Sequence, residues 1–157
     1  MVAAITMSEK GIHNILINIG HPWAFHTGRD AVGEVQPGMV VGCIALTADT
    51  YDCELPDAAN DYPAAVALCN PEHDVDTAYS LNDEFTIALV GGGHNVWSFS
   101  DSQKGNKMGT KMATAVGGTG TLTDITEANK FEHCCIKFGE DPDYANTRPI
   151  SVILVPG

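Results

Sequence analysis

Basic residues are scarce in this 157-residue chain, and their scarcity argues against two classes of partner. Eight Lys and Arg stand against 20 Asp and Glu, which gives a formal net charge of −12 at pH 7. Proteins that bind nucleic acids neutralise phosphates with clustered Lys and Arg, and attachment to anionic membranes uses the same residues. Only Lys104, Lys107 and Lys111 come close together in this sequence. We therefore expect neither nucleic acid nor membrane among the partners.

Long apolar runs and leader patterns are also missing. No segment approaches the roughly 18 apolar residues that a transmembrane helix needs, and residues 1–10 lack the basic start and apolar stretch of a signal peptide. The five cysteines are an odd number and show no disulfide-framework spacing. We expect free thiols in a chain made in a reducing cytoplasm.

Helical periodicity is nearly absent, whereas strand patterns separated by turn residues recur along the chain. Residues 39–46 form a nearly continuous apolar run that predicts a strand buried on both faces, and Phe85, Ile87 and Leu89 alternate as one core face. Gly91–Gly93 predicts the turn of a hairpin. The predicted strands are 12–19, 39–46, 64–69, 84–90, 94–99, 111–116, 121–126, 131–138 and 150–155.

This pattern predicts an all-β fold with little or no helix, because many short strands at this spacing are typical of barrels and sandwiches. The length suits a single domain over residues 11–157, preceded by an N-terminal arm at 1–10. Two acidic loops are expected at 49–63 and 70–83. Both exceed ordinary connection lengths, which indicates a binding role for them.

The six His and five Cys are the side chains in this sequence best suited to bind a transition metal. The densest cluster is His133-Cys134-Cys135, where a strand would place His133 and Cys135 on one face and Cys134 on the other. Zinc needs four ligands, or three and a water, and neither C-x-x-C nor H-E-x-x-H occurs. A packed strand with buried thiols is the preferred interpretation, and no metal or other cofactor is predicted.

Other catalytic and ligand-binding patterns are equally weak. Asp74-Val75-Asp76 and Asp141-Pro142-Asp143 alternate as calcium loops do, but they lack the Gly and distal Glu of an EF-hand. The Gly-rich segments 91–93 and 117–120 lack a P-loop Lys, and no G-x-S-x-G nucleophile elbow is present. We therefore predict no catalytic residue and expect that the protein is not an enzyme. The segment 21–26, HPWAFH, is the most unusual and is expected to plug a barrel end or an interface.

Three segments carry a family resemblance. They are VQPGMVV at 35–41, QKGNKM at 103–108 ahead of a strand, and the closing pair formed by 131–139 and RPISVIL at 148–154. Together these segments resemble the small capsid decoration, or cement, proteins of tailed phages and related viruses. The long loops and the His-rich 20–26 segment depart from the small members of that family.

The resemblance implies a β-barrel or β-tulip-like subunit that forms a homotrimer. It also implies a virion location on the capsid exterior after synthesis in the host cytoplasm, with the major capsid protein as partner. The expected function is to bind the outer shell and stabilise it.

Two alternatives remain open from the sequence. The first is a non-catalytic carbohydrate- or partner-binding β module that uses Trp23, Trp97 and Tyr51 as stacking platforms. The second is a small metal-dependent barrel enzyme with His21, His26, His94 and His133 as ligands.

Overall fold

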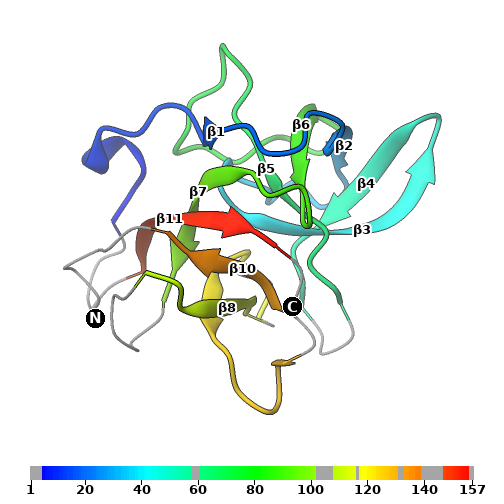
Figure 1. Ribbon diagram of the computed structural model, residues 1–157. Helices are drawn as coiled ribbons and strands as arrows, with labels where there is room; N and C mark the ends of the chain where they lie inside the picture. Colours follow the sequence, from blue (N-terminus) through cyan, green and yellow to red (C-terminus); the bar gives the residue numbers. More distant parts are fainter. Residues whose placement is uncertain are drawn as a thin grey trace.

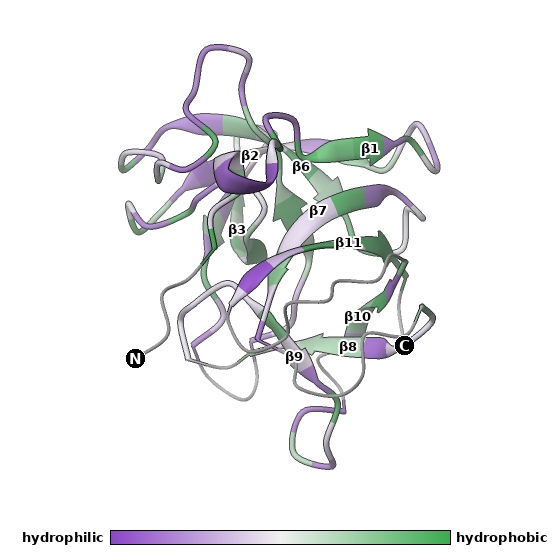
Figure 2. Cartoon of the chain, turned by 90° about the vertical axis from the view of Figure 1, so that its left-hand side faces the viewer, coloured by the Kyte–Doolittle hydropathy of each residue, from purple (hydrophilic) through white to green (hydrophobic). Residues whose placement is uncertain are grey.

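The computed structural model describes residues 5–57, 61–101, 108–115, 117–130, 133–138 and 147–155. In these residues the regular structure is one 3-10 turn, η1 (Ser8–Lys10), and eleven strands, which confirms the all-β prediction. Figure 1 shows their arrangement, and Figure 2 shows that the loops around them are largely hydrophilic. The strands are β1 (Leu16–Asn18), β2 (Phe25–Asp30), β3 (Val40–Thr47), β4 (Thr50–Glu54), β5 (Ala65–Ala67), β6 (Glu84–Leu89), β7 (Asn95–Ser100), β8 (Lys111–Thr114), β9 (Leu122–Asp124), β10 (His133–Lys137) and β11 (Arg148–Leu154).

The first half of the chain forms a closed five-stranded barrel in the order β2-β4-β3-β5-β6. The pairing of β2 with β4 is parallel, and the other four pairings are antiparallel. The interior holds a cluster that includes Val41, Cys53, Phe85 and Ile87. Gly28 is required on β2, because an added Cβ would lie 2.8 Å from Ile87 Cγ2 and 2.9 Å from Cys53 Sγ.

The second half forms a six-stranded sheet in the order β1-β7-β11-β10-β8-β9. One further parallel pair, Ser100 with Leu122, joins β7 to β9. Strands β7 to β11 are thereby paired in a second ring, and β1 is added outside it on β7. The predicted strands at 111–116 and 121–126 correspond to β8 and β9, which pair as an antiparallel hairpin.

The two rings have the same pairing scheme. The strands of each ring can be numbered one to five in chain order, which gives β2 to β6 in the first ring and β7 to β11 in the second. In both rings strand one pairs in parallel with strand three. The other four pairings are antiparallel and join two with three, two with four, four with five, and five with one. The fold is therefore an internal duplication of one five-stranded unit.

Corresponding residues of the two units meet in a common core. In the first unit Val66 is opposite both Val40 and Ala88, and in the second Cys135 is opposite both Met112 and Leu154. All six residues belong to one buried cluster, to which Ile15, Val96 and Ile150 also contribute. The two rings therefore share one hydrophobic core. The three facing residues of each ring lie on its second, fourth and fifth strands, and we call each set a row.

The predicted hairpin of residues 84–90 and 94–99 is wrong. Strand β6 is bonded on both sides, by β2 and β5, and β7 is bonded by β1 and β11. The Gly91–Gly93 segment instead carries the chain from the first ring to the second, with Gly93 N donating to Leu154 O at 2.9 Å. Two successive alternating strands next to a Gly turn therefore belong to different units.

The predicted loop at 49–63 is wrong over residues 50–54, which form β4. Its acidic Asp52 is accommodated because Arg29 on the neighbouring β2 bonds it through Nε at 2.9 Å and Nη2 at 2.6 Å. The prediction of a strand buried on both faces at 39–46 holds for Val40 and Val41 and fails for Ile44 and Leu46, which are exposed. Strands β3 and β4 extend beyond the ring as a projecting hairpin (Figure 1).

Residues 5–10 of the predicted N-terminal arm lie against the rest of the protein. Met7 is fully buried in the shared core, and its side chain lies where a Cβ on Gly38 would be 2.6 Å from Met7 Cε. Ile5 N donates to Thr147 O at 2.9 Å, and Ser8 is bonded to Asp76. Residues 1–4 of the arm lie outside the described residues.

Truncation of Ile87 tests the predicted core face of β6. Phe85 and Ile87 are buried in the first barrel and Leu89 packs against the same cluster, as the alternation predicts. Ile87→Ala should lower the free energy of unfolding by roughly 2–5 kcal/mol because it opens a cavity in a closed interior. Chemical denaturation measures it, with the exposed neighbour Thr86→Ala as the control, for which we expect less than about 1 kcal/mol. Equal effects of the two variants would contradict this packing.

The turn of the projecting hairpin offers a second test. Ala48 and Asp49 both have positive φ, 48° and 65°. Two-residue turns of this kind favour Asn and Gly, because a Cβ in the left-handed region costs about 1–2 kcal/mol. Ala48→Asn should therefore raise the free energy of unfolding by roughly 0.5–1 kcal/mol. The control is Ala45→Asn in the extended part of the same hairpin, which should give no gain; a gain at both positions would mean that the turn geometry is not the cause.

Candidate functional surfaces

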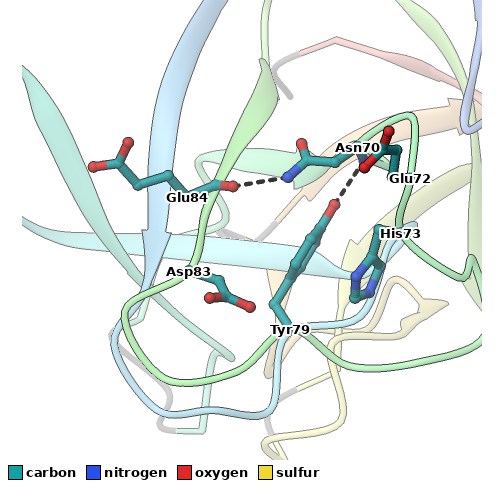
Figure 3. A pocket seen from close by; sticks show the side chains of 6 residues that line it. All are labelled: Asn70, Glu72, His73, Tyr79, Asp83 and Glu84. Carbon is teal, nitrogen blue, oxygen red and sulfur yellow. Dashed lines mark hydrogen bonds between the residues drawn. The ribbon is translucent and has the colours of Figure 1, made fainter.

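The predicted binding loop at 70–83 is a loop in the structure, and it forms a shallow hollow with the start of β6. The hollow has a volume of about 310 Å³ and is lined by Asn70, Glu72, His73, Tyr79, Asp83 and Glu84. Figure 3 shows the Tyr79 ring standing at its centre beside His73, with carboxylates around it. A surface of this kind suits a polar or cationic group better than an anion.

A stack of three rings holds this loop in place. The His73 and Tyr79 rings are 4.0 Å apart at 19°, and Tyr79 and Phe85 are 4.6 Å apart at 14°. The Tyr79 hydroxyl donates to Leu68 O at 2.8 Å and accepts from Asn70 N at 2.9 Å. Burial raises the pKa of Tyr79 to about 12. The ring therefore connects the loop to the interior of the first barrel.

The paired aspartates of this loop do not converge on a common point. Asp74 accepts from Asp76 N and from Thr77 Oγ1, both at 3.0 Å, and these bonds lower its pKa. The Asp76 carboxylate has a different partner and accepts from Ser8 N at 3.2 Å and from the Ser8 hydroxyl. Asp74 thus stabilises the turn at 74–77, and Asp76 connects the loop to the N-terminal segment. The other candidate pair, Asp141 and Asp143, lies outside the described residues.

The His133-Cys134-Cys135 cluster lies within the second unit on β10. Both ring nitrogens of His133 are buried, and burial lowers the pKa of this histidine. Cys134 and Cys135 are fully buried, and the Cys134 thiol together with burial raises the pKa of Cys135. Among the described residues, no three His, Cys, Asp or Glu side chains are grouped as metal ligands. The absence of a metal stays a prediction.

The His-rich 20–26 segment is held in place by a third histidine, His94, from the next unit. His94 is fully buried, accepts from Gly20 N through Nδ1 at 3.0 Å and contacts Ala24 O through Nε2 at 2.8 Å. With Nδ1 accepting, Nε2 carries the proton and donates to Ala24. The Phe25 ring stacks on it at 4.1 Å. His94 thus acts as a structural link between the two rings.

The remaining histidine candidates have separate local contacts. His21 Nδ1 accepts from Trp23 N at 3.2 Å, and His26 Nδ1 accepts from Thr27 N at 2.9 Å. The His26 ring meets Tyr51 edge-on at 4.6 Å. The four histidines of the metal-enzyme alternative are therefore not brought together as one ligand set.

The three aromatic residues proposed as stacking platforms differ in exposure. Trp23 is 81% exposed on the turn before β2. Tyr51 is half-buried beside His26, and Trp97 packs against the shared core. The carbohydrate-binding alternative is left with one largely exposed ring.

The projecting β3–β4 hairpin is the surface that sequence reasoning missed. Ile44 and Leu46 are 54% and 56% exposed, and Tyr62 is exposed beside the base of the hairpin. Large apolar side chains gathered on an exposed projection are typical of a contact surface. The signal that could have revealed it is the Ala48-Asp49 pair between an apolar run and the segment TYDC at 50–53.

The described part of the chain contains no helix that is long and apolar enough to cross a lipid bilayer.

Comparison with known proteins places the fold. No family model matches the sequence, and no curated protein matches it. Among solved structures, the chain is similar to the N base of head fiber gp8.5 in bacteriophage phi29, with a TM-score of 0.51 and 12% sequence identity. The match covers 83% of this chain and 92% of that one. The expected likeness to phage structural proteins therefore holds at the level of the fold, and a likeness to the cement proteins in particular is not shown.

Removal of the Tyr79 hydroxyl tests the anchoring of the 70–83 loop. Tyr79→Phe leaves the Leu68 carbonyl and the Asn70 amide without their partner, which should lower the free energy of unfolding by about 1–3 kcal/mol. Tyr62→Phe is the matched control, because Tyr62 is 62% exposed and should change stability by less than about 0.5 kcal/mol. Urea denaturation measures both, and equal effects would show that the hydroxyl does not anchor the loop.

Alkaline unfolding gives an independent readout of the same residue. An unfolded tyrosine loses its proton near pH 10, whereas folded Tyr79 keeps it until about pH 12. Between these values the folded state holds more protons, so its stability falls as pH rises. Denaturation midpoints measured from pH 9 upward should fall less steeply in Tyr79→Phe than in the unsubstituted protein. Identical pH dependence in the two proteins would contradict the burial of this hydroxyl.

Proposed function

We propose that the protein is a virion structural protein that binds the outer surface of a phage capsid and stabilises it. The observation that carries the proposal is the fold shared with the head-fiber N base over most of both chains. The segments that resemble capsid decoration proteins support the same conclusion from the sequence. On this proposal the protein acts without catalysis, as a homotrimer on the major capsid protein.

The protein would stabilise the capsid through its free energy of binding, without a chemical reaction. A protein that binds the assembled shell but not its dissociated subunits stabilises the shell by mass action. Three copies held in one trimer would bind with an avidity greater than that of one copy, because the second and third contacts form at a high effective concentration. The strong negative charge keeps such a subunit away from DNA and favours a basic partner surface.

The projecting hairpin is the contact surface we assign to the shell. Ile44 and Leu46 are exposed on β3, past Val40 and Val41 where β3 pairs with β5, so they can reach a neighbouring protein without rearrangement of either barrel. The ring beneath is closed and gives the hairpin a fixed base. The shallow 70–84 hollow, with its carboxylates, would be a second, polar point of contact.

Sedimentation with phage particles tests the proposal. Purified protein mixed with particles from its source should sediment with them in a sucrose gradient at a copy number comparable to that of the major shell protein. Leu46→Asp should reduce the bound amount at least tenfold, because a charge would be buried without a partner. Ile19→Asp is the control and should leave binding unchanged, since Ile19 is 62% exposed next to β1, away from both assigned contacts, and Leu46 is 56% exposed on the hairpin.

Each result has a definite meaning. Absence of the unsubstituted protein from particles would overturn the capsid proposal and favour the partner-binding module, for which quenching of Trp23 fluorescence by sugars is the next measurement. Full binding of Leu46→Asp would retain the capsid proposal but remove the hairpin from the contact. Sedimentation equilibrium of the free protein decides separately whether it is a trimer.

A further inference from the structure

Two cysteines face each other at the base of the projecting hairpin. Cys43 on β3 and Cys53 on β4 are direct partners in the antiparallel register, immediately before the register shift at Ala45. Directly opposed residues in antiparallel strands have Cα separations of about 4.5 or 5.5 Å. Disulfides span Cα separations of about 4.4–6.8 Å. The register pairing of Cys43 with Cys53 therefore falls within the range of Cα separations that a disulfide spans.

The two thiols differ in access. Cys53 is fully buried in the barrel, next to Gly28, and its Sγ also contacts Tyr51 O at 3.4 Å. Cys43 is half-buried and lines a hollow of about 170 Å³ that also includes Glu54, Asp61 and Tyr62. A small reagent can thus reach Cys43 first, with Cys53 behind it.

The electrostatics of the pair agree with this order. The neighbouring Cys53 thiol lowers the pKa of Cys43, while burial opposes this shift. The same interaction, with burial, raises the pKa of Cys53. Since the thiolate is the nucleophile in disulfide exchange, the more accessible cysteine is also the one that ionises first.

We propose that Cys43 and Cys53 form a site of reversible oxidation that locks the base of the β3–β4 hairpin with a cross-strand disulfide. The inference depends on the geometry of the hairpin alone and goes beyond the proposed capsid role.

The oxidant is a small-molecule disulfide, RSSR. The Cys43 thiolate attacks one sulfur of RSSR, which forms a Cys43–S–S–R mixed disulfide and expels the first RS⁻. Cys53 gives its proton to water and its thiolate attacks Cys43 Sγ, which forms the Cys43–Cys53 bond and expels the second RS⁻. Two protein thiols are oxidised, one RSSR is reduced to two RSH, and the expelled thiolates take up the two protons.

Closure of this bond would fix the segment between the cysteines. That segment contains Ile44, Leu46 and the strained Ala48-Asp49 turn. A cross-link across a hairpin reduces the conformations open to the unfolded chain and to the frayed hairpin. The oxidised form should therefore present the exposed apolar side chains on a more rigid support.

Thiol mapping of the full-length protein tests the site. Reduced protein is incubated with bis(2-hydroxyethyl) disulfide, a neutral probe chosen because Glu54 and Asp61 line the hollow. The protein is then alkylated under denaturing conditions, digested and analysed by mass spectrometry. We expect alkylatable thiols to fall from five to three, with one cross-linked peptide pair that contains Cys43 and Cys53. The oxidised protein should melt several degrees higher than the reduced protein.

Cys43→Ser is the decisive variant, since the position is half-buried and serine is nearly the same size. It should give no cross-linked pair and no shift in melting temperature on oxidation. Cys69→Ser is the matched control, a second half-buried cysteine outside the pair, and should keep both signals. A stable mixed disulfide on Cys43 with Cys53 still alkylatable would overturn the proposal. So would a Cys134–Cys135 bond as the sole product, or an unchanged pair of thiols.

Discussion

A parallel pair of strands closes each half of this protein, β2 with β4 and β7 with β9. Parallel neighbours cannot be joined by a tight turn and need a longer connection, which in each unit contains one strand, β3 or β8. In both units that strand turns back as a hairpin with the third strand, and this returns the chain alongside the first. Closure satisfies the backbone groups that an open edge would expose. Strand order and the shared core follow from this one arrangement.

Local patterns in the sequence were enough to locate most strands but not to pair them. Alternation at Phe85 and Ile87 identified β6 and its buried face, and the turn at 117–120 identified the β8–β9 hairpin. The pairing of β6 with β2 and β5 joins residues distant in sequence, which a local Gly turn cannot reveal. The strand β4 was hidden by its acidic residues, because the partner that makes Asp52 tolerable, Arg29, lies on another strand.

The duplication was invisible in the sequence for a physical reason. The corresponding rows are Val, Val and Ala in one unit and Met, Cys and Leu in the other. Cores accept many combinations of apolar side chains provided that volume and pattern are kept. The two units share a pattern of backbone hydrogen bonds between strands. Such a pattern does not require particular side chains, so it cannot be recognised in the sequence. Among the candidate site residues, His94, Asp74 and Asp76 have hydrogen-bond partners within the protein, which a single sequence cannot reveal.

The acidic residues and the exposed apolar residues of this surface act on other molecules over different distances. The net charge of −12 acts over about 10 Å at moderate salt and repels DNA and other acidic surfaces. The exposed Ile44 and Leu46 act only on contact, where burial of apolar area contributes roughly 25 cal/mol per Å². On the proposed function, the partner would offer a neutral or basic surface around an apolar patch that receives Ile44 and Leu46. Since Ile44 and Leu46 are exposed on the part of β3 that no longer pairs with β5, contact can be made at the hairpin while most of the acidic surface stays in solvent.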